Sequence, residues 1–315
     1  MPASPTDPTP MSPHTPNPPM PIVPPPAGVD EDLALLLAEP LASGWAQAAP
    51  QGDAVAALHD RLAARLAERL QASRQAEAGF TTVRRRSAPR QPLAEGVSAQ
   101  WLYRAAAPPT PAGPPAQRCG EPWRALLIEL APGARFQGDG RLAGLDAAEL
   151  QREWLLLSGS ASVVAGSAAW WLSQRDYLVV PPGQPPAAWH SEGGALLFLR
   201  ESWQPGAAGA APVIVRDTEA GWPDFAPGIR RRVLWQRDGE AAMLYHADPG
   251  AQVPVHRHGH DEECLMVQGE LFLDDLLLQA GDYQLAPAGS GHRITETDTG
   301  VVIYAHGDLD LQFVA

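Results

Sequence analysis

Residues 253–270 read VPVHRHGHDEECLMVQGE and place three histidines and three carboxylates within eight positions. Successive side chains of a β-strand point to opposite faces, so His256 and His258, two residues apart, are expected on one face. Glu262 and Cys264 form a second pair with the same spacing. Neutral imidazoles with a carboxylate suit Zn, Fe, Mn, Ni or Cu, whereas Mg or Ca prefers oxygen donors alone. The stretch therefore predicts a transition-metal site on a strand.

The spacing of this cluster continues on both sides of it. Residues 250–269 follow the pattern G-x5-H-x-H-x3-E-x6-G, and residues 281–292 follow G-x5-P-x-G-x2-H. The two patterns resemble the two halves of the cupin signature. This resemblance implies a small jelly-roll barrel that holds one divalent metal ion; zinc is the first choice, and iron, manganese or nickel are the alternatives. It also assigns the metal ligands, which are His256, His258, Glu262 and His292.

The remaining polar residues of the cluster have other expected places. His260 and Asp261 fall on the turn between two strands and are expected in an exposed loop. Glu263 has the opposite strand parity from Glu262, so it should face away from the metal, and it is the fallback ligand if the strand slips by one residue. Cys264 should face the barrel interior, either as a small buried hydrophobe or as a redox-sensing thiol.

An internal repeat sets the architecture. The segment RDYLVVPPGQPPAAWHSEGGALLFLR at 175–200 aligns without gaps with GDYQLAPAGSGHRITETDTGVVIYAH at 281–306. Upstream, residues 153–163 align in the same way with residues 263–273. Short apolar runs between Pro- and Gly-rich turns are typical of a sandwich or barrel. One β-unit is therefore present twice, and SWQPGAAGAAP at 202–212 is expected to link the copies.

The first copy lacks the ligands of the second. Arg152 stands where Glu262 is expected to bind the metal, and Pro186 stands at the position of His292. A guanidinium is positively charged and offers no lone pair to a cation. The first barrel is therefore expected to be metal-free, with Arg152 as a candidate anion-binding group.

The chain is predicted to be mainly β, with two tandem cupin jelly-roll barrels behind a disordered tail and a short helical segment. The expected parts are a disordered Pro-rich tail at 1–29, a helical segment at 30–80, a degenerate metal-free barrel at 81–202 and a metal-binding barrel at 203–315. Within the helical segment, apolar residues recur at helical spacing from residue 55 to residue 70. This face would pack on a neighbour or dock a partner.

Composition narrows the class of protein. The net charge of −13 argues against direct nucleic-acid binding, which requires a basic footprint. Two cysteines are too few for a disulfide scaffold. The N-terminal residues lack the basic and apolar regions of a signal peptide, and no apolar run is long enough to span a membrane. We therefore expect a cytoplasmic protein.

The order of segments narrows the resemblance to the ChrR-like cupins, in which a helical anti-sigma module precedes a metal-binding cupin. Residues 81–315 carry it through segments such as RRRSAPRQPLAEGVSAQWLYR and VHRHGHDEECLMVQGEL. The helices depart from that group, whose anti-sigma module carries a His-x3-Cys-x2-Cys zinc site. This region has one histidine, His59, and no cysteine. Its helices would therefore either dock a partner through apolar surface alone or be a degenerate remnant of that module.

Two functions from different classes follow. The first is a regulator or sensor, in which the second barrel binds a small molecule and the N-terminal helices bind a sigma factor or another protein. The second is a metal-dependent cupin dioxygenase acting on a small enolisable substrate, with Glu262 as a candidate base.

Overall fold

The structure is a computed structural model that describes residues 53–77, 79–105, 122–137, 150–204 and 210–314. It divides into two units, Met1–Leu70 and Gln71–Ala315. The predicted tail at 1–29 and the first part of the expected helical segment, 30–52, lie outside the described residues. Among the described helices, none combines the length and the hydropathy that a membrane crossing needs.

Helix α2 (Asp53–Glu77) covers the stretch with helical spacing and confirms that prediction. Four of the apolar residues that define the spacing lie on the described part of the first unit, and we call them the leucine stripe: Leu58, Leu62, Leu66 and Leu70. Their side chains are between 39% and 60% exposed. In the part of the chain that the structure describes, the stripe is therefore open to solvent rather than packed.

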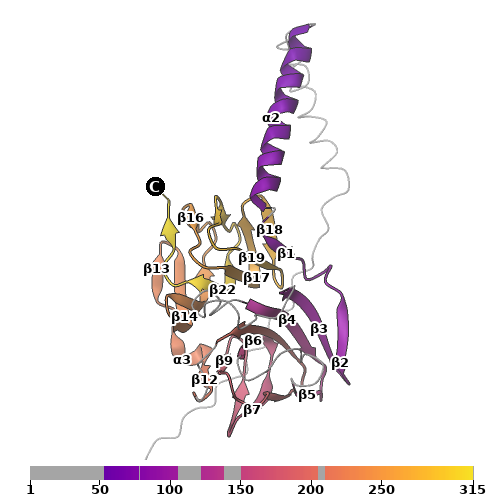
Figure 1. Cartoon of the computed structure of the whole chain (residues 1–315), viewed down its shortest axis with the longest axis vertical. Helices are drawn as coiled ribbons and strands as arrows, with labels where there is room; N and C mark the ends of the chain where they lie inside the picture. The colour runs from indigo at the N-terminus through magenta and orange to yellow at the C-terminus, as the bar shows by residue number, and fades with distance from the viewer. Residues whose placement is uncertain (1–52, 78, 106–121, 138–149, 205–209, 315) are drawn as a thin grey trace, which may run out of the picture. The chain divides into compact units, whose positions relative to one another are not determined.

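The second unit holds two β-barrels, coloured magenta to pink and orange to yellow in Figure 1. The first contains β2 (Arg90–Ala94), β3 (Val97–Arg104), β4 (Pro122–Leu130), β5 (Arg135–Gln137), β6 (Leu150–Gly159), β7 (Ala161–Ala165), β8 (Ala168–Leu172), β9 (Tyr177–Val180), β10 (Ala188–His190) and β11 (Ala195–Trp203). The second contains β13 (Asp224–Ala226), β14 (Ile229–Arg237), β15 (Glu240–Ala247), β16 (His256–Arg257), β17 (Glu262–Leu273), β18 (Leu276–Gln279), β19 (Tyr283–Ala286), β20 (Gly291–His292), β21 (Thr295–Glu296), β22 (Val301–Asp308) and β23 (Gln312–Phe313). Three short elements complete the described part: β1 (Thr81–Val83), β12 (Val213–Val215) and helix α3 (Asp217–Ala220).

Each barrel has one main sheet and a smaller facing layer. The main sheet of the first barrel has the order β12-β9-β6-β11-β4-β3-β2, and that of the second has the order β1-β19-β17-β22-β15-β14-β13. The smaller layer is β5-β10-β7-β8 in the first barrel. In the second it includes the outer half of β17 with β18 and β21, and the three strands β20-β16-β23. The prediction of two tandem barrels is confirmed.

The repeat is visible in the backbone as well as in the sequence. Gly159, the last residue of β6, and Gly269, within β17, occupy equivalent positions of the repeat. Their backbone φ angles are +79° and +77°. A Cβ at Gly159 would lie 2.2 Å from the carbonyl oxygen of Gly194, and a Cβ at Gly269 would lie 2.1 Å from that of Gly300. Only glycine fits such a close approach at positive φ. The same close approach of two backbone segments therefore occurs in both copies.

The two barrels exchange a strand. β1 precedes the first barrel in the sequence but pairs with β19 of the second, with Thr82 opposite Gln284. β12 precedes the second barrel but pairs with β9 of the first, with Ile214 opposite Leu178. Figure 1 shows purple β1 beside yellow strands of the second barrel. The expected boundary after residue 202 falls inside β11, which runs to Trp203.

The two main sheets share a buried core that contains charged residues. Arg200 is 1% exposed; it donates to Glu153 Oε1 at 3.1 Å and to Glu263, which belongs to the other barrel. Tyr177 donates to Glu153 at 2.5 Å, and Tyr283 donates to Glu263 at 2.6 Å. Glu153 and Glu263 occupy equivalent positions of the repeat, as do the two tyrosines. One arginine therefore joins the two copies.

Candidate metal centre

The four predicted ligands lie at one end of the second barrel. β16 pairs with β20 so that His256 is opposite His292. His258 follows β16 directly, and Glu262 is the first residue of β17. The histidines are 2–3% exposed and Glu262 is 9% exposed. A short three-stranded sheet and one long strand thus bring together residues from both sequence motifs.

Three of the four residues form a group that can hold a metal ion. One ligand atom each of His256, His258 and Glu262 lies within 4.8 Å of the others. His258 Nδ1 is 2.9 Å from Glu262 Oε2. His292 is outside this tightest group, but its ring centroid is 5.0 Å from that of His258 and 5.7 Å from that of His256. Three of the predicted ligands therefore lie close enough for one metal ion, and the ring of His292 lies beside two of them.

Hydrogen bonds orient two of the imidazoles. The Nδ1 atom of His256 is 3.0 Å from the carbonyl oxygen of Pro254, and Nδ1 of His292 is 3.2 Å from Oδ2 of Asp274. Each Nδ1–H donates to an oxygen, which leaves the lone pair on Nε2 for a metal. Asp274 itself accepts from the backbone of Arg293 at 2.7 Å.

Asp274 is a functional residue that sequence reasoning missed. Burial by itself raises the pKa of its carboxyl, but the bonds from His292 and the backbone of Arg293 lower the pKa below its usual value. The carboxylate is therefore ionised and holds the His292 ring. The backbone of Asp274 has a φ of +53° in the turn after β17. The turn residues LDDL were its one signal in the sequence.

His258 tests whether a metal fits this site. Both of its ring nitrogens are buried without a hydrogen-bond partner, because the close approach to Glu262 lacks hydrogen-bond geometry. A buried polar group with no partner is costly, and coordination would satisfy it. Burial by itself raises the pKa of Glu262, but His258, His292 and His256 lower it to about 2. Three imidazoles and one carboxylate fit a divalent transition metal.

Glu263 and Cys264 lie where strand parity predicted. Glu263 points away from the site, toward Arg200 and Tyr283. Cys264 faces the interior, and its Sγ is 3.4 Å from Glu262 Oε1. Burial, the largest influence, raises the pKa of the Cys264 thiol well above its usual value. A protonated thiol is a weak nucleophile, which agrees with its interpretation as a small buried hydrophobe.

The two turn residues also have defined roles. His260 has a side chain that is 42% exposed, and its Nδ1 contacts the buried Asp308. Asp261 accepts a hydrogen bond of 2.8 Å from the backbone of Ala288. These contacts hold the loop and keep both side chains out of the ligand group.

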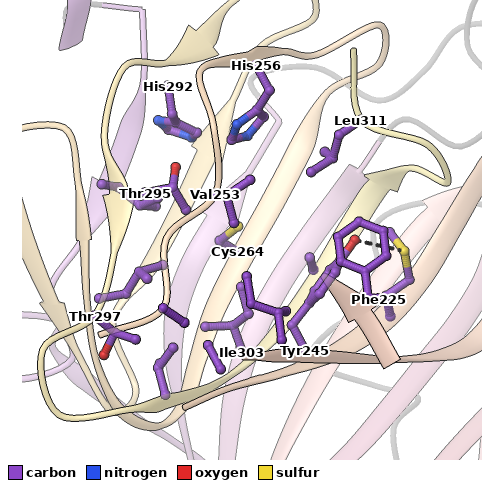
Figure 2. A pocket seen from close by; sticks show the side chains of 18 of the residues that line it. Phe225, Tyr245, Val253, His256, Cys264, His292, Thr295, Thr297, Ile303 and Leu311 are labelled. Atoms are coloured by element: carbon purple, nitrogen blue, oxygen red, sulfur yellow. Dashed lines mark hydrogen bonds between the residues drawn. The ribbon is translucent and has the colours of Figure 1, made fainter. Parts of the chain in front are cut away.

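A cavity of about 60 Å³ opens beside the ligands, inside the barrel. Figure 2 shows His256 and His292 at one end and Ile303 and Tyr245 further in. Most of the wall is aliphatic or aromatic, and Leu311, next to the C-terminal strand β23, closes one side. The wall includes Ala247, Leu271 and Ala305.

Large rings occupy the interior of the first barrel at positions that line the cavity in the second. The aligned positions are Phe136 for Val253, Trp154 for Cys264 and Trp189 for Thr295. The Trp154 ring centroid is 4.9 Å from that of Trp189 and 6.4 Å from that of Phe136. All three are buried.

The expectation that Arg152 binds an anion is wrong. Its Nε donates to Oε1 of Glu201 at 3.3 Å, and both side chains are buried. Glu201 also pairs with Arg124. Sequence reasoning treated Arg152 as unpaired because the carboxylate that it contacts, Glu201, lies on β11, far away in the sequence. A protein carboxylate takes the place that the prediction gave to a ligand.

Residues 210–310 match the family described as the ChrR Cupin-like domain. No curated protein matches the sequence. Solved structures match the fold with a TM-score of 0.55 for YlbA of Escherichia coli, at 16% identity over 73% of this chain and 90% of that chain. A protein of Nostoc punctiforme proposed to be a dioxygenase also gives 0.55, at 13% identity over 75% and 85%. Oxalate decarboxylase of Bacillus subtilis gives 0.50, at 17% identity over 72% and 76%. At these identities the likeness concerns the fold alone.

Proposed function

We propose that this chain, whose residues 210–310 match the ChrR Cupin-like domain, is a metal-dependent sensor that regulates a protein partner. The second barrel binds one divalent metal ion, zinc in the first instance, through His256, His258, Glu262 and His292. A small molecule enters the cavity beside the metal. The observation that carries this proposal is the buried His258 ring, whose two nitrogens make no hydrogen bond of good geometry in the described part of the chain although Nδ1 lies 2.9 Å from Glu262 Oε2.

The residues around the site would hold the metal and limit what reaches it. The bound ion would supply a Lewis acid that attracts an oxygen or nitrogen donor. Pro254 and Asp274 fix the rings of His256 and His292 through their Nδ1 atoms. The apolar wall of the cavity excludes bulk water, so a ligand there binds with little competition from solvent.

The leucine stripe of α2 supports the regulatory part of the proposal. Four leucines at helical spacing with 39–60% exposure are the kind of face that docks into a groove of a partner. The net charge of −13 favours a partner with basic surface. A sigma factor is the first candidate because the ChrR-like cupins follow an anti-sigma module.

A metal-dependent dioxygenase is the second candidate. Two observations favour it: the cavity adjoins the proposed ligands, and a structure with the same fold is proposed to be a dioxygenase. In this case Glu262 would be the base that takes a proton from an enolisable substrate. The pKa of its carboxyl is about 2, so the ionised Glu262 is a weak base until it loses its histidine contacts.

Two experiments separate the candidates. The full chain is loaded anaerobically with Fe(II), and oxygen uptake is measured with β-diketones and flavonols. We expect none; uptake that His258→Ala abolishes would establish the enzyme instead. In parallel, the full chain is tested for binding to purified sigma factors.

The binding test has a matched pair of variants. Leu62→Glu places a charge on the leucine stripe, whereas Ala64→Glu places the same charge on another exposed face of α2. We expect the first to weaken binding by about tenfold or more and the second to leave it unchanged. Equal effects of the two variants, or no binding by the parent chain, would contradict the regulatory proposal.

A further inference from the structure

The second barrel carries small side chains at cavity-lining positions where the first barrel carries large ones. Ala247 and Ala305 line the cavity, and the aligned residues of the first barrel are Leu130 and Leu199. Cys264 aligns in the same way with Trp154. All of these residues are buried in their own barrel. Small residues at positions that hold large ones in the other copy leave room for a ligand.

The cavity is also poor in charge. Glu262 is the one carboxylate among its lining residues, and no arginine lines it. Arg231, on neighbouring β14, donates to the carbonyl oxygen of Leu309 at 2.5 Å and stacks on Phe225 at 4.3 Å. A divalent ion with one carboxylate leaves a local charge of about +1. One negative charge on a ligand would neutralise it, and a second would lie unpaired in an apolar cavity at high cost.

The volume limits the rest of the ligand. The cavity measures about 60 Å³, whereas an engineered apolar cavity of about 150 Å³ holds one benzene ring. A tail of about two or three carbons therefore fits beside a head group at the metal.

We infer that the second barrel binds a monocarboxylate with a short aliphatic tail, whose head lies at the metal and whose tail lies between Ala247, Ala305 and Leu271. This inference rests on the proposed metal site. It separates the chain from oxalate decarboxylase, whose name gives a dicarboxylate substrate, although the two share a fold.

The experiment uses the full chain loaded with Co(II), whose visible spectrum reports the coordination of the metal. Butyrate, oxalate and 1-propanol are titrated separately at neutral pH. We expect butyrate to change the spectrum with saturation, and oxalate and propanol to bind at least about tenfold more weakly. Loss of cobalt binding itself would sink the proposed function, whereas cobalt binding without this preference sinks only the inference.

Variants test the position of the tail. Ala305→Leu installs the residue of the first barrel and should weaken butyrate by about tenfold or more while the cobalt content stays at about one per chain. Ala211→Leu adds the same side chain at an exposed position as the control. If Ala305→Leu does not fold, Leu271→Ala enlarges the cavity instead and should shift the preference from butyrate toward hexanoate. Unchanged ligand preference in the folded variants would overturn the inference.

Discussion

Replacing Arg200 by methionine should destabilise the protein far more than replacing an arginine in an exposed ion pair. Arg200 is 1% exposed and lies between Glu153 and Glu263, each 1% exposed, so its removal leaves two buried carboxylates without their cation. Breaking a buried pair in this way costs about 3–5 kcal/mol. For a unit of this size the loss corresponds to a fall in Tm of roughly 6–20 °C.

The loss should depend on pH. Burial is the largest influence on the pKa of Glu153 and raises it, while His306 and Arg200 lower it below its usual value. Burial already raises the pKa of Glu263 above its usual value with Arg200 present. Without Arg200, burial raises it further and prevails at Glu153 as well, so both folded pKa values lie above the unfolded value of about 4.3. A carboxyl whose folded pKa is raised costs stability above that pKa and nothing below the unfolded one. The cost should therefore be largest near pH 7 and shrink toward about pH 4.

The assay is urea unfolding followed by tryptophan fluorescence, with calorimetry for Tm. Arg90→Met is the matched control, because Arg90 and Glu129 form an ion pair of 2.5 Å with side chains 54% and 44% exposed; we expect it to cost below about 1 kcal/mol. Adding Glu153→Gln and Glu263→Gln to Arg200→Met should restore much of the loss. Equal costs for the two arginine variants would refute the reasoning.

Three further predictions follow from the two barrels. His258→Ala should reduce bound metal, measured by elemental analysis, from about one ion per chain to a small fraction, whereas His260→Ala should leave the metal content unchanged. A parent chain that binds two ions would contradict the single site. Trp154→Ala should cost about 3–5 kcal/mol in urea unfolding without changing metal content, and a loss below about 1 kcal/mol would show that the first barrel is not filled as described. Gly269→Ala should lower Tm sharply because its Cβ would meet the Gly300 carbonyl. A Tm equal to the parent's would show that β17 does not approach Gly300 as closely as described.

The residues that sequence reasoning predicted best are those whose positions follow from spacing. The strand parity of Glu262 and Glu263 placed one carboxylate at the site and the other behind it, and the structure agrees because a strand alternates its faces strictly. The repeat predicted two barrels because equal turns recur at equal intervals. Helix α2 was predicted from its leucine spacing.

What sequence reasoning missed depends on contacts between distant segments. Asp274 holds the His292 ring from a turn eighteen residues earlier in the chain, and nothing local distinguishes it from Asp275. Arg152 was assigned to an anion because its partner, Glu201, lies on another strand. The exchanged strands β1 and β12 are three residues each, too short for their composition to name the sheet they join.

The strand exchange has a consequence for how this molecule could change over time. A homodimer of identical barrels must accept every substitution twice, since one gene encodes both copies. In this chain the short strand that precedes each barrel pairs with the other barrel within a single polypeptide. The two barrels therefore associate at any protein concentration, and a substitution can change one without changing the other. One copy was therefore free to fill with Trp154 and Trp189 while the other kept a hollow and four converging donors. Because the two copies are covalently joined, a substitution in one barrel need not be repeated in the other.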